Sequence, residues 1–371
     1  MLSQKKLQKI AKNIVNVNLG VREKDVTIIT AGPKSLKFAE ALAFECAMKG
    51  AQPSIQYGSD ELALKIYKKI NPKFLKNWPK LSDVLTKIAD VEIHLDESNP
   101  FLEKQLPQKK IEIRRKIIEP IKRKRDIRLK KKTMRLALVG FPTEETAKAL
   151  KTSFNKLNKI FWNTMDIDYK KLYQYNNLVI RKLRNAKKIR IIGEKTNLEF
   201  SIKNRKFING CGIIAKEKFG YLNLPEGEVF IAPVENSANG EIYFDLPCMG
   251  HYGKQVEGVW FKFKKGRVVD YRIEKGQKDF EDIIKNVSGD KDRIAEFGIG
   301  TNPKAKITGG LIIVDEKVRG TIHIAIGDNK LYGGKNDATI HWDFFKDMRK
   351  NSVVKADGRI VIKNGLLVGF K

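Results

Sequence analysis

The chain of 371 residues carries 73 Lys and Arg against 43 Asp and Glu, which gives a formal net charge of +30. Because 42% of the residues are hydrophobic, the composition excludes a chain that is disordered throughout. The three cysteines (Cys46, Cys211 and Cys248) are scattered, which excludes a disulfide framework and a zinc ribbon. No apolar run approaches the roughly 18 residues that a membrane-spanning helix needs. The length predicts about two domains.

The first residues also bear on location. Residues 1–12 are polar and basic and lack the apolar stretch of a secretory signal. Together with the few, scattered cysteines, this predicts a cytoplasmic protein without a membrane partner.

Residues 1–185 alternate short β-branched runs with helical patterns. Strands are predicted at 26–30, 53–57, 91–95 and 135–140, and helices at 35–48, 60–70, 111–132 and from 143, with a possible interruption at Pro120. This alternation predicts a doubly wound α/β domain. The turn at 30–35 contains a single glycine and lacks the G-x-G-x-x-G pattern, so the domain is predicted to be a scaffold without a nucleotide site.

Residues 186–371 have a different pattern, in which short strands are separated by turns rich in Gly, Asn and Lys. Strands are predicted at 188–192, 197–202, 228–232, 241–244, 259–264, 267–273 and 311–314, and a helix at 280–286. The second domain is therefore predicted to be mixed, mainly antiparallel and β-rich. The whole chain is predicted to be a two-domain α/β and α+β protein.

Two histidines near the C-terminus stand in marked contexts. His323 lies in GTIHIAIG and His341 in IHWDF, where Asp343 shares a strand face with His341. Imidazole and carboxylate groups on one face suit a metal ion such as Zn²⁺, although a single H-x-D is more often a hydrogen-bonded pair.

Two carboxylates extend this set. Glu228 precedes an apolar strand and Glu296 lies in EFGIGTNP, where burial of the charge requires a partner or a metal. Two histidines and three carboxylates form an inventory that suits a two-metal hydrolase.

The same stretches resemble a known family. NLPEGEVFIAP (223–233), EFGIGTNP, GTIHIAIG and IHWDF are similar to motifs of the thermophilic metalloaminopeptidases, that is, aminopeptidase T and its bacterial relatives. GFPTEETA (140–147) and the N-terminal α/β order are similar more loosely. The chain looks like a shorter-type member.

The resemblance implies a metal-dependent aminopeptidase that acts on peptides with a free N-terminus, and a homodimer. It implies that two divalent ions (Zn, Co or Mn) are bound by Glu228, Glu296, His323, His341 and Asp343. Glu296 is expected to carry a proton, and Tyr332, in a segment spaced differently from the family's, to donate to an oxyanion.

Two alternatives remain at this point. The metal site could serve another amide or ester substrate. A basic segment, 101–135, holds 15 basic and 4 acidic residues, so a nucleic-acid-binding protein with a vestigial site is also conceivable. Lys104–Arg135 contains no aromatic residue, which makes a nucleic-acid partner the weaker interpretation.

Overall fold

The computed structural model describes residues 3–77, 79–97, 99–102, 105–250 and 253–369. Two short parts of the chain discussed above, residues 103–104 of the basic segment and residues 1–2, lie outside the described residues. The chain forms two compact units, Met1–Ala147 with Gly212–Pro225, and Lys148–Cys211 with Glu226–Lys371. Each unit is described by itself.

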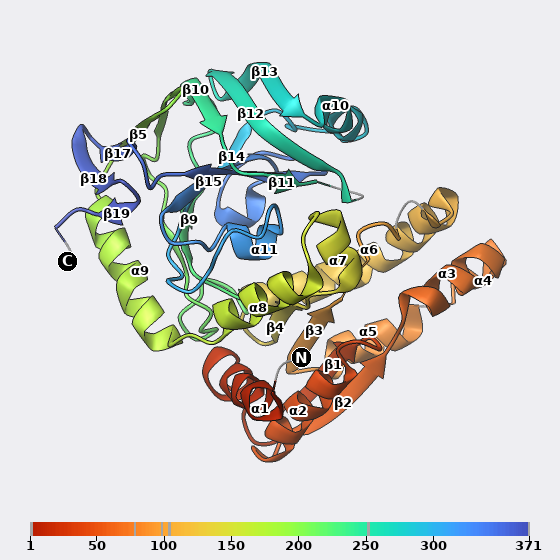
Figure 1. The fold of residues 1–371 in the computed structure, drawn as a ribbon. Helices are drawn as coiled ribbons and strands as arrows, with labels where there is room; N and C mark the ends of the chain where they lie inside the picture. The colour runs from red at the N-terminus through yellow and green to blue at the C-terminus, as the bar shows by residue number, and fades with distance from the viewer. Residues whose placement is uncertain (1–2, 78, 98, 103–104, 251–252, 370–371) are drawn as a thin grey trace. The chain divides into compact units, whose positions relative to one another are not determined.

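The first unit is built on a parallel sheet of five strands (Figure 1). Its strands are β1 (Val26–Ala31), β2 (Gln52–Tyr57), β3 (Val91–Asp96), β4 (Arg135–Gly140) and β8 (Tyr221–Leu224). The spatial order is β2-β1-β3-β4-β8, and each neighbouring pair is parallel. Because the order reverses at β1, helices cover both faces, as the doubly wound prediction requires.

Helices of the first unit connect these strands. They are α1 (Gln4–Asn13), α2 (Leu36–Ala47), α3 (Asp60–Lys69), α4 (Pro72–Leu75), α5 (Pro79–Ile88), α6 (Gln108–Lys130) and α7 (Glu144–Ala149). A π-helical turn, η1 (Ile14–Asn18), follows α1. The basic helix α6 continues through Pro120, so the possible interruption there does not occur.

The second unit contains two β-sheets. The larger sheet holds β5 (Lys188–Gly193), β6 (Thr196–Ser201), β10 (Asn239–Phe244), β11 (Cys248–Met249), β12 (Gln255–Lys264), β13 (Arg267–Lys275), β17 (Val353–Ala356), β18 (Arg359–Lys363) and β19 (Leu366–Leu367). The smaller sheet has the order β16 (His341–Asp347), β15 (Thr321–Gly327), β14 (Ile294–Gly300), β9 (Glu228–Ile231) and β7 (Ile208–Gly210). All pairs in the smaller sheet are antiparallel.

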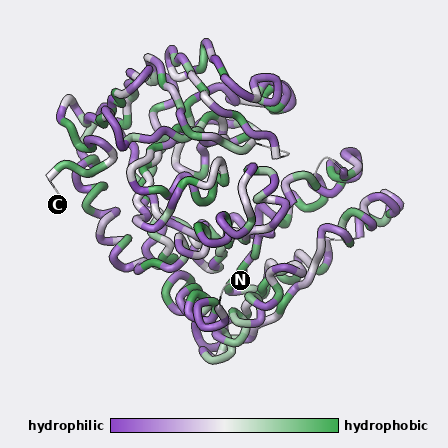
Figure 2. The backbone as a smooth tube through the Cα atoms, in the orientation of Figure 1, coloured by the Kyte–Doolittle hydropathy of each residue, from purple (hydrophilic) through white to green (hydrophobic). Residues whose placement is uncertain are grey.

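A core rich in aromatic side chains joins the two sheets of this unit. Phe344 of the smaller sheet lies 4.9 Å from Phe261 and 5.6 Å from Phe244 of the larger sheet, measured between ring centroids. Phe297 contacts Phe200 in the same way, at 5.3 Å. Hydrophobic stretches alternate with hydrophilic ones along much of the trace, as the green and purple of Figure 2 show. These aromatic contacts show that one face of the smaller sheet packs against the core.

Four helices complete the second unit: α8 (Phe154–Met165), α9 (Tyr169–Leu183), α10 (Gln277–Lys285) and α11 (Ile312–Asp315). Within the described residues, no helix is long and apolar enough to cross a membrane. The sequence pattern predicts a boundary at 185/186, whereas residues 148–185 group with the second unit and 212–225 with the first. The change of pattern near 185 marks the end of α9.

The strand predicted at 311–314 is wrong, because this segment forms the short helix α11. Its β-branched residues favour a strand, but the carboxylate of Asp315 holds the preceding turn in another conformation. That carboxylate accepts hydrogen bonds from the N–H and hydroxyl of Thr308 and from the N–H of Gly310. Tertiary hydrogen bonds thus override local strand preference.

Candidate metal centre

Four strands of the smaller sheet bring the five predicted ligands together on one face. Side chains alternate between faces along a strand, so Glu296 and His323 lie opposite the core-facing Phe297 and Ile324. The register sets His323 beside Gly298, Glu228 beside Gly300, and Asp343 beside Ala325. The sequence motifs therefore converge because these strands are neighbours.

Glycine at position 298 makes room for one of the histidines. A Cβ atom at Gly298 would lie only 1.9 Å from Nε2 of His323. Any side chain at 298 would push the imidazole out of its place, since real Cβ contacts are far longer. Glycine at 298 is thus a packing requirement of the site.

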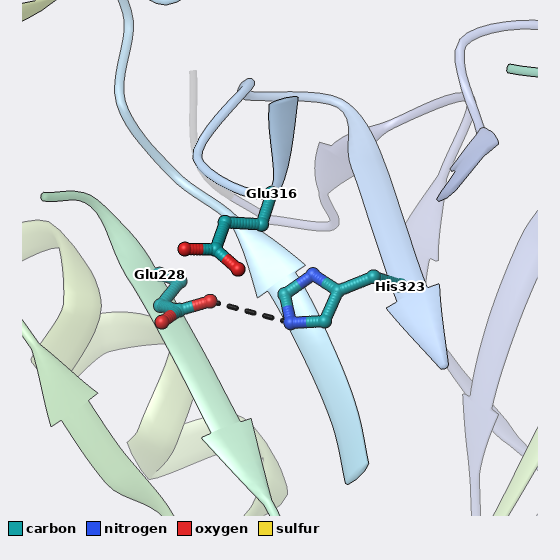
Figure 3. A group of neighbouring side chains, drawn as sticks. All are labelled: Glu228, Glu316 and His323. Atoms are coloured by element: carbon teal, nitrogen blue, oxygen red, sulfur yellow. Dashed lines mark ion pairs between the residues drawn. The ribbon is translucent and has the colours of Figure 1, made fainter. Parts of the chain in front are cut away.

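A first group of donors consists of Glu228, Glu316 and His323. Figure 3 shows the two carboxylates and the imidazole ring facing one another. Their ligand atoms lie within 4.8 Å of one another, and Oε2 of Glu228 is 3.3 Å from Nε2 of His323. All three side chains are buried.

A second group consists of Glu296, His341 and Asp343, whose ligand atoms also lie within 4.8 Å of one another. Nε2 of His341 is 3.4 Å from Glu296 and 3.6 Å from Asp343. Nδ1 of His341 lies 2.7 Å from the carbonyl oxygen of Asp328, a contact in which the ring nitrogen must donate. This hydrogen bond places a proton on Nδ1, so Nε2 is the nitrogen that faces the carboxylates and would bind a metal ion.

Glu296 links the two groups. Its Oε1 atom is 3.2 Å from Nε2 of His323, while Oε2 faces His341. Burial alone would raise the pKa of Glu296, but the two histidines beside it hold the pKa below its usual value. The carboxylate is therefore held as an anion between two imidazoles.

The structure adds charged residues that the sequence analysis did not assign. Lys317 is fully buried, with Nζ 2.6 Å from Glu228, 2.7 Å from Glu316 and 3.0 Å from Glu226. Burial raises the pKa of Glu226 and of Glu316, against the effect of the Lys317 charge. The charged triplet 315–317, directly before GTIHIAIG, is the sequence signal that could have identified Glu316 and Lys317.

Buried polar contacts also fix the backbone under these ligands. Asn176 of α9 donates to the carbonyl of Glu228 at 2.9 Å and accepts from the hydroxyl of Thr301 at 2.7 Å. Asn302 donates to the carbonyl of Glu226 at 2.8 Å. A Cβ atom at Gly227 would lie 2.6 Å from Cβ of Asn302, so these two segments pack closely only if residue 227 is glycine.

Tyr332 lies at the edge of the second group. Its ring contacts His341 and Phe230 edge to face, with centroids 5.3 and 5.2 Å apart. Burial and then the nearby carboxylates, led by Glu296, raise the pKa of the phenol well above its usual value. Tyr332 therefore keeps its proton and can donate it in a hydrogen bond.

The donor set fits divalent cations. Two of its buried carboxylate oxygens, Oε2 of Glu228 and Oδ1 of Asp343, have no hydrogen-bond partner among the described residues. Buried carboxylate oxygens that accept no hydrogen bond are costly, and oxygen and imidazole donors of this kind suit Zn²⁺, Co²⁺ or Mn²⁺. The site therefore offers ligand atoms that suit a divalent metal ion.

Comparison with known proteins agrees with this chemistry. A family model described as thermophilic metalloprotease (M29) matches residues 3–366. The chain is 20% identical to aminopeptidase AmpS of Bacillus subtilis over 305 residues, 76% of this chain and 74% of AmpS. It is 33% identical to aminopeptidase T of Thermus thermophilus over 110 residues, 28% of this chain and 26% of that protein.

Two solved structures share the fold. Wild-type AmpT from Thermus thermophilus has a TM-score of 0.81 at 20% identity, covering 98% of this chain and 99% of AmpT. A 2,5-dihydroxypyridine dioxygenase from Pseudomonas putida KT2440 has a TM-score of 0.66 at 15% identity, covering 100% of this chain and 99% of the dioxygenase. Since one fold supports such different reactions, function has to be argued from the site.

Proposed function

The chain belongs to the thermophilic metalloprotease (M29) family and is a metal-dependent aminopeptidase, and we propose that it releases N-terminal residues from peptides through water activated by two divalent ions. The observation that carries this proposal is the pair of largely buried donor groups built on and beside neighbouring strands, with two carboxylate oxygens that accept no hydrogen bond. Glu228 and His323, with Glu316 beside them, would hold one ion. Glu296, His341 and Asp343 would hold the other.

Divalent ions in such a site supply Lewis acidity and a hydroxide nucleophile at neutral pH. The chain's own residues supply the rest. Lys317 fixes the orientation of Glu228 through a 2.6 Å contact, and Asp328 fixes the ring of His341 through its carbonyl oxygen. Both contacts pre-organise donors that would otherwise rotate.

Proton transfer is assigned to Glu296 and oxyanion binding to Tyr332. Glu296 faces both imidazoles, so it can accept a proton from the attacking water and pass it to the leaving amine. The protonated phenol of Tyr332 can donate a hydrogen bond to the oxygen that becomes negative. The substrate's free amine would be bound among the carboxylates, which explains a requirement for an unblocked N-terminus.

The test measures metal content and turnover together. Purified protein should hold about two divalent ions and hydrolyse leucyl-anilide, but not its N-acetylated form. His341→Ala should lose metal and at least about 100-fold of the activity. His94→Ala is the matched control, since His94 lies on β3 of the first unit, and it should retain both properties.

The outcome distinguishes the alternatives. Equal turnover of acetylated and free-amine substrates would support another amide or ester hydrolase. No turnover of any free-amine peptide by the metal-loaded protein would refute the proposal.

Two further properties are proposed. We infer a homodimer, which sedimentation would test, from the family resemblance. We also infer a cytoplasmic location, because Cys46, Cys211 and Cys248 are buried and none of them forms a disulfide, and fractionation would test it.

A further inference from the structure

The loop 328–340 connects the strand of His323 to the strand of His341 and Asp343. It carries the half-buried Tyr332 in a single 3₁₀ turn, η4 (Lys330–Tyr332), whose other two residues are exposed. Its inner side is tied down by two buried asparagines. Asn336 donates to the carbonyls of Ile294 and Gly327, at 2.8 and 3.0 Å, and Asn329 to that of Ala295, at 3.2 Å.

An ion pair formed by two residues outside the loop bonds the outer side of its backbone. Nη2 of Arg205 lies 2.7 and 2.6 Å from the two carboxylate oxygens of Glu235, and both side chains are largely buried. Nη1 of Arg205 donates to the carbonyl of Gly333 at 2.5 Å. Oε1 of Glu235 accepts from the N–H of Lys335 at 2.6 Å. The pair thus bonds the backbone of Gly333, which directly follows Tyr332, and that of Lys335.

Further along the loop, the N–H of Asp290 donates to the carbonyl of Asp337 at 2.8 Å. The ion pair borders a cavity of about 680 Å³, which is lined by charged side chains including Lys203, Asp290, Arg293 and Lys335. Because the loop faces open volume here, side-chain packing cannot fix Gly333 and Lys335. The hydrogen bonds to Arg205 and Glu235 hold the backbone of Gly333 and Lys335 in place instead.

We propose that Arg205 and Glu235 are positioning residues that set the orientation of the Tyr332 phenol at the metal site. The proposal rests on the proposed function. Arg205 lies in the turn after β6 of the larger sheet, and Glu235 lies after β9, the strand of the smaller sheet that carries Glu228. Residues from both sheets thus fix the position of the Tyr332 hydroxyl. A displacement of Gly333 would move the Tyr332 ring away from its contact with His341.

Kinetics of Arg205→Ala test this role. We expect kcat on leucyl-anilide to fall about tenfold to hundredfold, because small misplacements of a catalytic group cost that much. KM and metal content should stay close to those of the original chain, and Arg205→Lys should restore part of the rate. Lys203→Ala is the matched control, because Lys203 lines the same cavity and forms none of the bonds described above.

A double-mutant cycle with Tyr332→Phe separates positioning from a general structural effect. If Arg205 acts through Tyr332, adding Arg205→Ala to Tyr332→Phe should cause little further loss. Fully additive losses, an unchanged kcat in Arg205→Ala, or loss of metal from that variant would each overturn the proposal.

Hydrogen exchange keeps this proposal distinguishable from the proposed function. Amides of residues 329–337 should exchange at least about tenfold faster in Arg205→Ala, with β15 and β16 unchanged. Unaltered exchange in this loop overturns the role of the pair whatever the activity. Absence of turnover in the original chain, with faster loop exchange in the variant, overturns the proposed function and leaves the pair's hold on the loop supported.

Discussion

Lys317 is a cation built into the first donor group. Its ammonium group contacts Glu226, Glu228 and Glu316, and its side chain is 0% exposed. A buried charge of this kind is stabilising only while its partners remain, and removal of one partner leaves the others uncompensated. Lys317 therefore compensates the negative charge of these carboxylates, which one metal ion would neutralise only in part.

Replacement of Lys317 should cost stability in a metal-dependent way. In Lys317→Met we expect the free energy of unfolding of the metal-free protein to fall by about 3–5 kcal/mol, since buried carboxylates lose their counter-charge. Added Zn²⁺ should raise its melting temperature more than that of the original chain. Thermal unfolding with and without metal measures both effects.

Lys346 provides the control for this experiment. It is buried to the same degree, but its Nζ donates to the carbonyl of Tyr243 at 3.0 Å and does not contact the donor groups. Lys346→Met should also be destabilised, with an ordinary response to metal. An equal metal response in the two variants would contradict the assigned role of Lys317.

At the scale of elements, the stability that the loop after β15 contributes to the fold should depend on pH. Burial alone would raise the pKa of Glu235, but backbone N–H groups, including that of Lys335, and the guanidinium of Arg205 hold it below its usual value. A carboxylate with a lowered folded-state pKa adds stability above its unfolded pKa, near 4.5. That stability is lost as the pH falls through the folded-state pKa.

Glu235→Gln should remove this contribution. At pH 7 we expect the variant to be less stable by about 1–2 kcal/mol, because hydrogen bonds to a charged group are lost. The difference from the original chain should shrink as the pH falls below about 4. Urea unfolding across this pH range measures it, and a difference independent of pH would show that Glu235 acts without its charge.

The elements around the site could be predicted from sequence to different extents. The strand that carries Glu228 was predicted because an apolar, β-branched run begins there. The strand of Glu296 was not predicted, because Gly298 and Gly300 are residues more typical of turns. Helices α8 and α9 were missed although their buried residues recur at helical spacing. The role of Asn176 on α9 was also missed, because its hydrogen-bond partners lie far away in the sequence. The strand at 311–314 was wrong because Asp315 organises the preceding turn, a contact no local pattern contains.

The pattern of predicted strands could not show that the ligands converge. His323 and Glu228 are far apart in the chain, and only the order β16-β15-β14-β9 brings their side chains to one face. Strand order depends on long-range pairing, which a single sequence does not encode in any local window. The family resemblance supplied the five expected ligands, but it gave no indication of Glu316, Lys317 or the Arg205–Glu235 pair.

For the whole molecule, metal should act on one unit. The donor groups all belong to the second unit, while the first unit has a core of its own that includes Ile28, Met134 and Leu136. Ligand binding stabilises the structure that binds, by about 4 kcal/mol at a metal concentration 1,000 times Kd. Removal of metal should therefore weaken the second unit selectively.

Hydrogen exchange with and without chelator can show this selectivity. Amides of β14, β15 and β16 should lose protection when metal is removed. Amides of β1 and β3 serve as the internal control and should keep their protection. Equal loss in both sets would show that metal acts on the stability of the whole chain.

The path of the chain between the units has a consequence for biosynthesis. The parallel sheet takes its last strand, β8, from residues that follow 64 residues of the second unit, Lys148–Cys211. On the ribosome, β4 must therefore wait with an unpaired edge until residue 224 emerges, and such edges pair readily with other chains. A fragment that ends at residue 147 would keep that edge open permanently, so we expect it to aggregate where the complete polypeptide does not.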